Sequence, residues 1–319
     1  MSDEGRALFS LPVGEGAGAI LGLAAGDTAG GASDKGYSSS TQQAVVVAYH
    51  LFRHGYLDRD ALTVELAELD GDERDPSVYR ALSPDMRRWL DSVRAGEADY
   101  GSEPSLDPAV RAVPLGMWFR RRPEDLVTST LDCARVTHLD APSAVLTTAV
   151  AAAVAGGCFA QNGRDLVMAV VEVARQAVTV IQSDDLRYAH SDQVDEVISR
   201  LRRSADLIGT PGPELTGALG DDPAGMVAAA LSLTAPVTSR PHRPIEEAVE
   251  IGGSPLGAIV GAVLGARVGV RVWPWDFPND TWFVAMGERL VAGKSDLAEL
   301  PVPYAVEQRI TYASPDPQL

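Results

Sequence analysis

The stretch Gly14–Gly30, GEGAGAILGLAAGDTAG, carries a glycine at every fourth position. Residues four apart share one face of a helix, so these glycines clear a strip where a neighbouring backbone can approach closely. Each glycine inside a helix costs about 1 kcal/mol relative to alanine, so close packing has to offset that loss. A second strip with the same spacing is formed by Gly257, Gly261, Gly265 and Gly269. We therefore expect two central helices that pack near each other and end at the same cleft.

The remainder of the chain is also mostly helical in pattern, with turns rich in Gly, Pro, Asp and Ser between the helices. The segments with the clearest helical pattern are 16–25, 41–54, 58–69, 84–95, 143–160, 164–182, 191–207, 224–233, 244–251, 255–268 and 280–291. Alternation typical of a strand is limited to a weak pattern between Tyr304 and Tyr312. The sequence predicts an all-α fold, with a short extension over residues 1–15, one compact multi-helix domain over 16–292 and a C-terminal tail over 293–319.

The formal net charge of −17 disfavours nucleic acids and anionic membranes as partners, because both carry dense negative charge. The two basic clusters, Arg120–Arg122 and Arg200–Arg203, lie at helix ends or on polar helix faces, where water solvates them. The longest apolar stretch, residues 144–160, includes two threonines and is too short to span a membrane. We expect neither a nucleic acid nor a membrane as a partner.

The two cysteines, Cys133 and Cys158, lie in helical patterns among apolar or small residues. This setting is typical of core residues in a reducing compartment, and it offers no partner for a catalytic thiolate. The acidic start, Met1–Glu4, lacks the basic and apolar regions of a signal peptide. We expect a cytoplasmic protein.

Several short motifs follow the first glycine helix in a fixed order. They are Pro114-Leu115-Gly116 after Arg111, Thr137-His138-Leu139-Asp140, Gly252-Gly253 with the apolar helix 258–267, and Phe277-Pro278-Asn279-Asp280-Thr281-Trp282. Together with Gly18–Gly30, these motifs resemble those of the ADP-ribosylglycohydrolase family, in the same order, from about residue 16 to residue 291. The resemblance implies an all-α fold whose central cleft holds two magnesium ions and cleaves ADP-ribose from a modified group.

The carboxylates that hold magnesium in that family are missing from this chain. At the early Thr-Asp-Asp-Thr segment, Ser39 and Ser40 stand at the two aspartate positions. At the late Gly-Gly-Asp-x-Asp-Thr segment, Ser254 and Leu256 stand at the aspartates and Gly257 at the threonine. Hydroxyls are weak ligands for magnesium and leucine is none, so the sequence predicts no metal and no cofactor.

Three residues are candidates for any remaining catalysis, and each has a structural alternative. Asp27 either orients a sugar or a loop in the cleft, or binds backbone amides at a helix end. Asp34 lies near the position of a family glutamate and is either a residual base or a solvated loop acid. His138 suits acid–base work or phosphate contact, but it also fits a role in supporting the corner where Asp140 would cap a helix.

The hydroxyls before the helix that starts near residue 41 either cap that helix or receive an anion at its amino end. The family's Gly-Asn-Gly loop is replaced here by residues 106–111, in which a proline fixes φ and removes a donor. The residues that we expect to bind ligand are Ser38, Ser39, Ser40, Thr41, Arg111, His138, Gly252, Gly253 and Ser254.

The leading hypothesis is a pseudoenzyme that binds ADP-ribose, a nucleotide or a related ligand in the central cleft. One alternative is a metal-independent hydrolase of an ADP-ribosyl or other glycosidic bond, which needs a proton donor and a positioned carboxylate. The other is a scaffold or oligomer with an unused cleft. If the protein is an enzyme, we expect a glycosidic-bond hydrolase that does not depend on magnesium.

Overall fold

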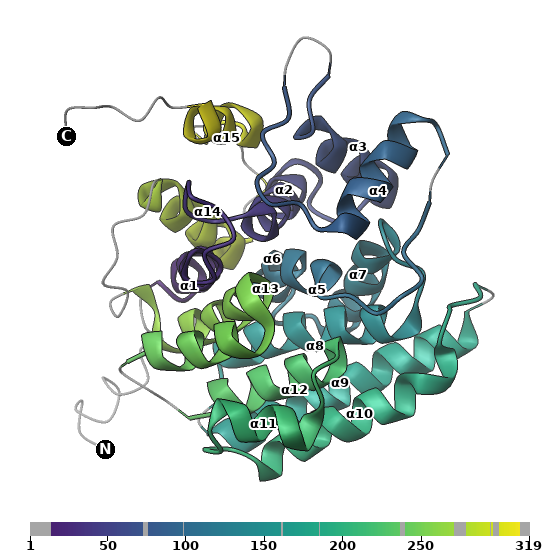
Figure 1. Ribbon diagram of the computed structural model, residues 1–319, viewed down its shortest axis with the longest axis vertical. Coiled ribbons are helices and arrows are strands. Elements are labelled where there is room, and N and C mark those ends of the chain that lie inside the picture. Colours follow the sequence, from purple (N-terminus) through teal and green to yellow (C-terminus); the bar gives the residue numbers. More distant parts are fainter. Residues whose placement is uncertain are drawn as a thin grey trace.

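The computed structural model describes residues 14–72, 76–97, 99–160, 162–184, 186–236, 240–270, 279–293, 295 and 300–312. These residues form an assembly of helices (Figure 1). Within the described ranges the β-type pairing is limited to three isolated bridges, such as the one between Gly101 and His138. The prediction of an all-α fold is confirmed.

Most predicted helices are present, with bounds that shift by a few residues. They are α1 (Glu15–Ala29), α2 (Ser39–His54), α3 (Arg59–Glu68), α4 (Pro84–Arg94), α8 (Ala141–Gly157), α9 (Gly163–Ser183), α12 (Pro223–Thr234), α13 (His242–Val268) and α14 (Asp280–Ala292). The predicted helix 191–207 is divided into η3 (Ser191–Gln193), α10 (Val194–Arg203) and η4 (Ser204–Asp206). Further helices that the sequence pattern did not predict are α5 (Asp107–Arg111), α6 (Val113–Trp118), α7 (Pro123–Arg135) and α11 (Gly212–Leu219).

The two glycine strips face each other, as the sequence predicts. A Cβ atom at Gly26 would lie 1.9 Å from the carbonyl oxygen of Gly257, and one at Gly261 would lie 1.9 Å from that of Gly22. The same relationship joins Gly18 and Gly265. Only hydrogen fits at these contacts, so the glycines allow α1 and α13 to run backbone against backbone (Figure 1).

α13 is bent where the sequence predicts a break between two helices. Gly252 and Gly253 have non-helical backbone angles, and Gly253 has a φ of +65°. A positive φ favours glycine because it has no Cβ. Pro255, two residues after Gly253, lacks the amide that would continue the hydrogen-bonding pattern. The kink separates an amino-terminal arm of α13 from the part that packs on α1.

The core is built mainly from alanine, valine and leucine. α8 is almost wholly buried and packs against α5, α6, α7, α9 and α13. Both cysteines are buried and do not form a disulfide with each other, as predicted for core residues.

α9 and α13 are long and apolar enough to cross a membrane by length and composition, but buried core helices pass the same test.

The prediction of a weak strand between Tyr304 and Tyr312 is wrong. These residues lie in α15 (Pro303–Tyr312), which packs on α2. Val306 and Glu307 are buried, so the alternation reflects one inward-facing side of a short helix. The described part of the C-terminal segment is therefore docked on the domain, whereas residues 1–13 and 313–319 lie outside the described ranges.

Candidate ligand cleft

The carboxylate of Asp27 joins the end of α1 to the start of α2. Its Oδ2 accepts the amides of Ser38 (2.9 Å) and Thr41 (3.0 Å) and the hydroxyl of Thr41 (2.7 Å). Its Oδ1 accepts the Ser38 hydroxyl at 2.7 Å. Burial raises the pKa of Asp27 above its usual value, against the opposing effect of these four donors. The side chain is fully buried and caps α2, which is the structural alternative that the sequence left open.

Ser39 and Ser40 begin α2 beneath a segment of chain that leads into α4. The amide of Ser39 donates to the carbonyl oxygen of Arg80 at 2.7 Å, and its hydroxyl donates to that of Ala81 at 3.2 Å. Ser38 caps the helix by accepting the amide of Ser40. The hydroxyls of Ser38 and Ser39 therefore bond to the protein itself, and Ser39 and Ser40 are both buried.

Ser254 and Leu256 follow the kink of α13 and are also buried. The hydroxyl of Ser254 donates to the carbonyl oxygen of Asp27 at 3.0 Å. A Cβ at Gly30 would lie 2.2 Å from that hydroxyl, so the loop after α1 packs tightly on the kink. The late segment thus meets the end of α1, and the side chain of Asp27 links that end to the early segment at Ser38 and Thr41.

A buried acidic residue that the sequence analysis missed lies beside the start of α2. Glu307, from α15, accepts hydrogen bonds from the hydroxyl of Tyr37 (3.0 Å) and the amide of Gln42 (2.9 Å). It also pairs with the guanidinium of Arg80 at 2.8 Å. Burial raises the pKa of Glu307, and Arg80 opposes that shift. Because its partners are up to 270 positions away, no local motif could have revealed this network.

Gln42 holds the segment that covers Ser39. Its side-chain nitrogen donates to the carbonyl oxygen of Val78 at 2.8 Å, and its oxygen accepts the amide of Arg80 at 2.9 Å. Ala81, which directly follows Arg80, has a φ of +50°. This left-handed conformation is uncommon for alanine and turns the chain toward α4.

Arg111 is fully buried and lies among α2, α5 and α7. Its guanidinium donates to the side-chain oxygen of Gln43 at 3.2 Å, to the carbonyl oxygen of Cys133 at 3.1 Å and to the hydroxyl of Thr137. These contacts join three helices. A role in ligand binding stays a prediction, and it would require this side chain to become accessible.

His138 is also buried, and its Nδ1 lies 2.8 Å from the Thr137 hydroxyl. Burial, with the positive charge of Arg111, lowers the pKa of His138 to about 3. The imidazole is therefore neutral near pH 7 and cannot serve there as a protonated acid. A Cβ at Gly101 would lie 2.8 Å from Nε2, so the ring packs against backbone.

Asp140 caps α8 by accepting the amide of Ser143 at 2.7 Å, as the sequence predicts. Asp34 is exposed on the loop between α1 and α2.

Asp107 is a second acidic residue that the sequence analysis did not consider. It lies in the 106–111 segment and accepts a hydrogen bond from the Ser83 hydroxyl. Burial raises the pKa of Asp107 above its usual value. The structure thus brings Asp27, Ser38–Thr41 and Ser254 together, and leaves Asp34 at the surface.

The residues at the four former carboxylate positions do not fit a magnesium pair. Magnesium prefers near-octahedral oxygen ligands with negative charge, whereas these positions offer three neutral hydroxyls and a leucine. The hydroxyls of Ser39 and Ser254 already donate to carbonyl oxygens. No metal-dependent step can be assigned to this arrangement.

One group of potential ligands in the described part of the chain consists of His50, His54 and Glu65. The Nε2 atom of His50 accepts the amide of Asp58 at 2.9 Å, so the ring proton is on Nδ1, which faces Glu65 at 2.9 Å. Arg53 also pairs with Glu65, at 2.8 Å. These bonds join α2 to α3, and they occupy the nitrogen that would face a metal.

The packing of α1 on α13 and the contact between Ser254 and Asp27 define an all-α protein in which the first core helix meets the last one at a kink. The family model for ADP-ribosylglycohydrolase matches residues 15–299, so the chain belongs to that family. A solved structure described as an ADP-ribosylglycohydrolase-related protein complex is similar in fold, with a TM-score of 0.64 and 20% identity. The match covers 88% of this chain and 98% of that one. The comparison with curated proteins found no match.

Proposed function

We propose that this protein is a member of the ADP-ribosylglycohydrolase family that does not perform magnesium-dependent hydrolysis. The observation that carries the proposal is the chemistry of the altered centre. Ser39 and Ser254 use their hydroxyls to bond main-chain oxygens, and Leu256 adds an apolar side chain. A pair of divalent cations placed there would lose its hydration without gaining compensating charge.

The metal-independent hydrolase has less support. Asp27 is enclosed by four hydrogen-bond donors, and His138 is not in its protonated, acidic form near pH 7. Asp34 is exposed to water on the loop between α1 and α2, whereas Asp27 and Ser254 are buried. We therefore propose a binding or regulatory role for a small ligand of the ADP-ribose or nucleotide type, without magnesium.

The first experiment is an assay of ADP-ribose release from ADP-ribosylated arginine and serine peptides, with magnesium and with chelator. We expect no release in either condition. Magnesium-dependent release would reject the proposal, and release in chelator that is lost in Asp34→Ala would establish the hydrolase instead.

The second experiment is isothermal titration of the protein with ADP-ribose in the same two buffers. Equal binding in magnesium and in chelator supports a metal-free binding site. Absence of binding in both buffers would favour the scaffold hypothesis, and analytical ultracentrifugation would then test for a stable oligomer.

A further inference from the structure

α15 lies at the edge of the helix assembly, and its main neighbour among the helices is α2 (Figure 1). All of α15 falls within the described residues, and its buried side chains are those of Val306 and Glu307. Tyr304 and Ile310 pack on the core only in part. A helix of 10 residues is marginal in water by itself, and one buried apolar side chain offsets little of the entropy lost on ordering it. Polar contacts therefore have to hold α15 in place.

The strongest of these polar contacts converge on the carboxylate of Glu307, which is fully buried. It accepts hydrogen bonds from the hydroxyl of Tyr37 at 3.0 Å and the side-chain amide of Gln42 at 2.9 Å. It also pairs with the guanidinium of Arg80 at 2.8 Å. Loss of this carboxylate would remove the ion pair and both hydrogen bonds together, so the docking of α15 depends on it.

The receiving surface of α15, formed by Tyr37, Gln42 and Arg80, also has contacts that do not involve α15. Nε of Arg80 donates to the main-chain oxygen of Tyr37 at 3.0 Å, and the guanidinium lies over the Tyr37 ring at 4.6 Å. The Tyr37 ring packs edge-on against Phe283. The side-chain oxygen of Gln42 accepts the amide of Arg80. The domain thus orients this surface without help from α15, as a binding site is oriented without its ligand.

α15 also holds residues 76–81, the segment that covers the start of α2. Three hydroxyl groups of the helix donate to main-chain oxygens of this segment at 2.6–3.2 Å. The pairs are Tyr304 with Pro76, Tyr312 with Ser77 and Thr311 with Val78. Further along the segment, the main-chain oxygen of Arg80 accepts the amide of Ser39, and that of Ala81 accepts its hydroxyl. α15, residues 76–81 and the first turn of α2 are therefore bonded in series.

We propose that α15 is a detachable strap that closes the start of α2. In the docked state Glu307 fills the receiving surface, and residues 76–81 are held over Ser39 of the altered centre. When α15 detaches, this segment loses its outer contacts and the first turn of α2 becomes accessible to solvent. Such local opening needs less free energy than global unfolding, because few buried contacts are lost. The inference does not depend on the proposed function.

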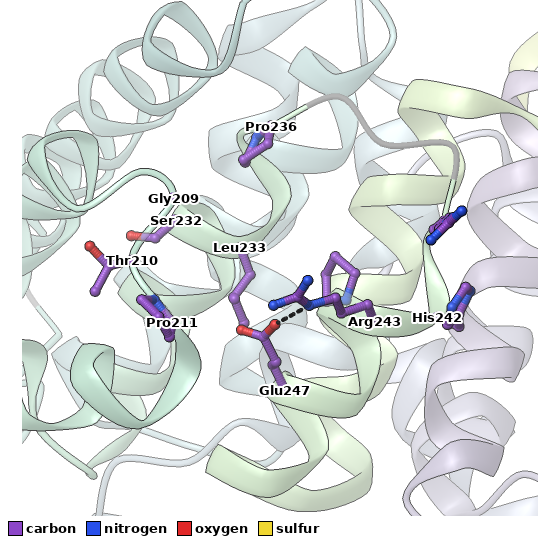
Figure 2. A pocket seen from close by; sticks show the side chains of 11 residues that line it. Gly209, Thr210, Pro211, Ser232, Leu233, Pro236, His242, Arg243 and Glu247 are labelled. Carbon is purple, nitrogen blue, oxygen red and sulfur yellow. Dashed lines mark hydrogen bonds and ion pairs between the residues drawn. The ribbon is translucent and has the colours of Figure 1, made fainter.

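The test is hydrogen exchange of the full-length protein, measured by mass spectrometry, in wild type, Glu307→Ala and Glu247→Ala. Glu247 is the matched control, because it is also a helical glutamate that pairs with an arginine, Arg243, and accepts the amide of Gly212 (Figure 2). Glu307→Ala should speed exchange about tenfold or more in α15, in residues 76–81 and in the first turn of α2, and leave α8 protected. Glu247→Ala should leave exchange in these three segments unchanged.

Three results would overturn the strap. Faster exchange in α15 alone would separate the helix from the segment that covers α2. Equally faster exchange in α8 would show that Glu307 supports the whole fold, and unchanged exchange in α15 would show that its docking does not need the carboxylate. Val306→Ala, which keeps the carboxylate, is the second variant should Glu307→Ala fail to fold. It should affect the same three segments by a smaller factor.

A synthetic peptide of residues 300–312 tests whether the helix is separable from the domain. Added to Glu307→Ala, it should restore the protection of residues 76–81, because the receiving surface is still present. The same peptide carrying Glu307→Ala should not restore it. Failure of the wild-type peptide at millimolar concentration would contradict a detachable strap.

Discussion

The hydroxyl of Ser254 donates a hydrogen bond to the main-chain oxygen of Asp27 across 3.0 Å, and this contact joins the kink of α13 to the end of α1. Ser254 stands where the family resemblance places an aspartate. An aspartate would present only acceptors to that carbonyl oxygen, inside a site where Ser254 is buried. The surroundings have therefore adapted to a donor.

This relationship predicts that restoring the family's residue is harmful. Ser254→Asp should lower the free energy of unfolding by about 2 kcal/mol or more, because it buries an unpaired acceptor or charge. Ser254→Ala, which only deletes the hydrogen bond, should cost about 1 kcal/mol. Urea denaturation with and without magnesium measures both. Stabilisation of the wild type by magnesium would contradict the proposed loss of the metal centre.

The glycine strips predict opposite effects of the same substitution at two helical positions. In Gly261→Ala the new methyl group would meet the carbonyl oxygen of Gly22, so α1 and α13 must separate, at a cost of about 1–3 kcal/mol. Gly217→Ala in α11 meets no atom within 4 Å, and the gain in helix propensity should stabilise the protein by up to about 1 kcal/mol. Thermal and urea unfolding distinguish the two. Equal effects would show that helix propensity, and not packing, determines the result.

The Glu307 network predicts that α15 is part of the folded domain. Glu307→Ala leaves Arg80 buried without its partner, and breaking such a pair typically costs about 3–5 kcal/mol. Limited proteolysis should then release the C-terminal segment from the variant before it cuts the wild type. Glu307→Gln keeps the shape and some acceptors, so it should be intermediate. Identical cleavage of wild type and Glu307→Ala would contradict the docking of α15.

The lowered pKa of His138 predicts that the free energy of unfolding depends on pH. Its pKa is about 3 in the folded protein and near 6.5 when unfolded, so the unfolded state binds the additional proton between these values. Stability from this group is complete above about pH 6.5 and is lost as the pH falls toward 3, by up to about 1.4 kcal/mol per pH unit. Urea denaturation between pH 7 and pH 4 should show a shallower loss in His138→Asn. A parallel loss in both proteins would show that His138 is accessible to protons.

Local spacing was sufficient to predict most of the longer helices and the close pairing of α1 with α13. A four-residue repeat of glycine has one geometric meaning in a helix, whatever surrounds it. The break at Gly252-Gly253 and the cap at Asp140 could likewise be predicted from the sequence, because each depends on residues within one helical turn of each other. The strand-like pattern at Tyr304–Tyr312 misled because one buried side of a short helix resembles alternation over ten residues.

The sequence by itself determined the family and the helical fold, and it placed serine or leucine at the four positions where the resemblance implies carboxylates, since each depends on residue identity in a fixed order. Only the tertiary structure decided what fills the altered centre. Asp27 is a helix cap, His138 is a buried neutral ring and Glu307 from the far end of the chain stabilises the start of α2. The burial, charge state and partners of these groups depend on contacts between distant segments, and those contacts exist only after the helices have packed.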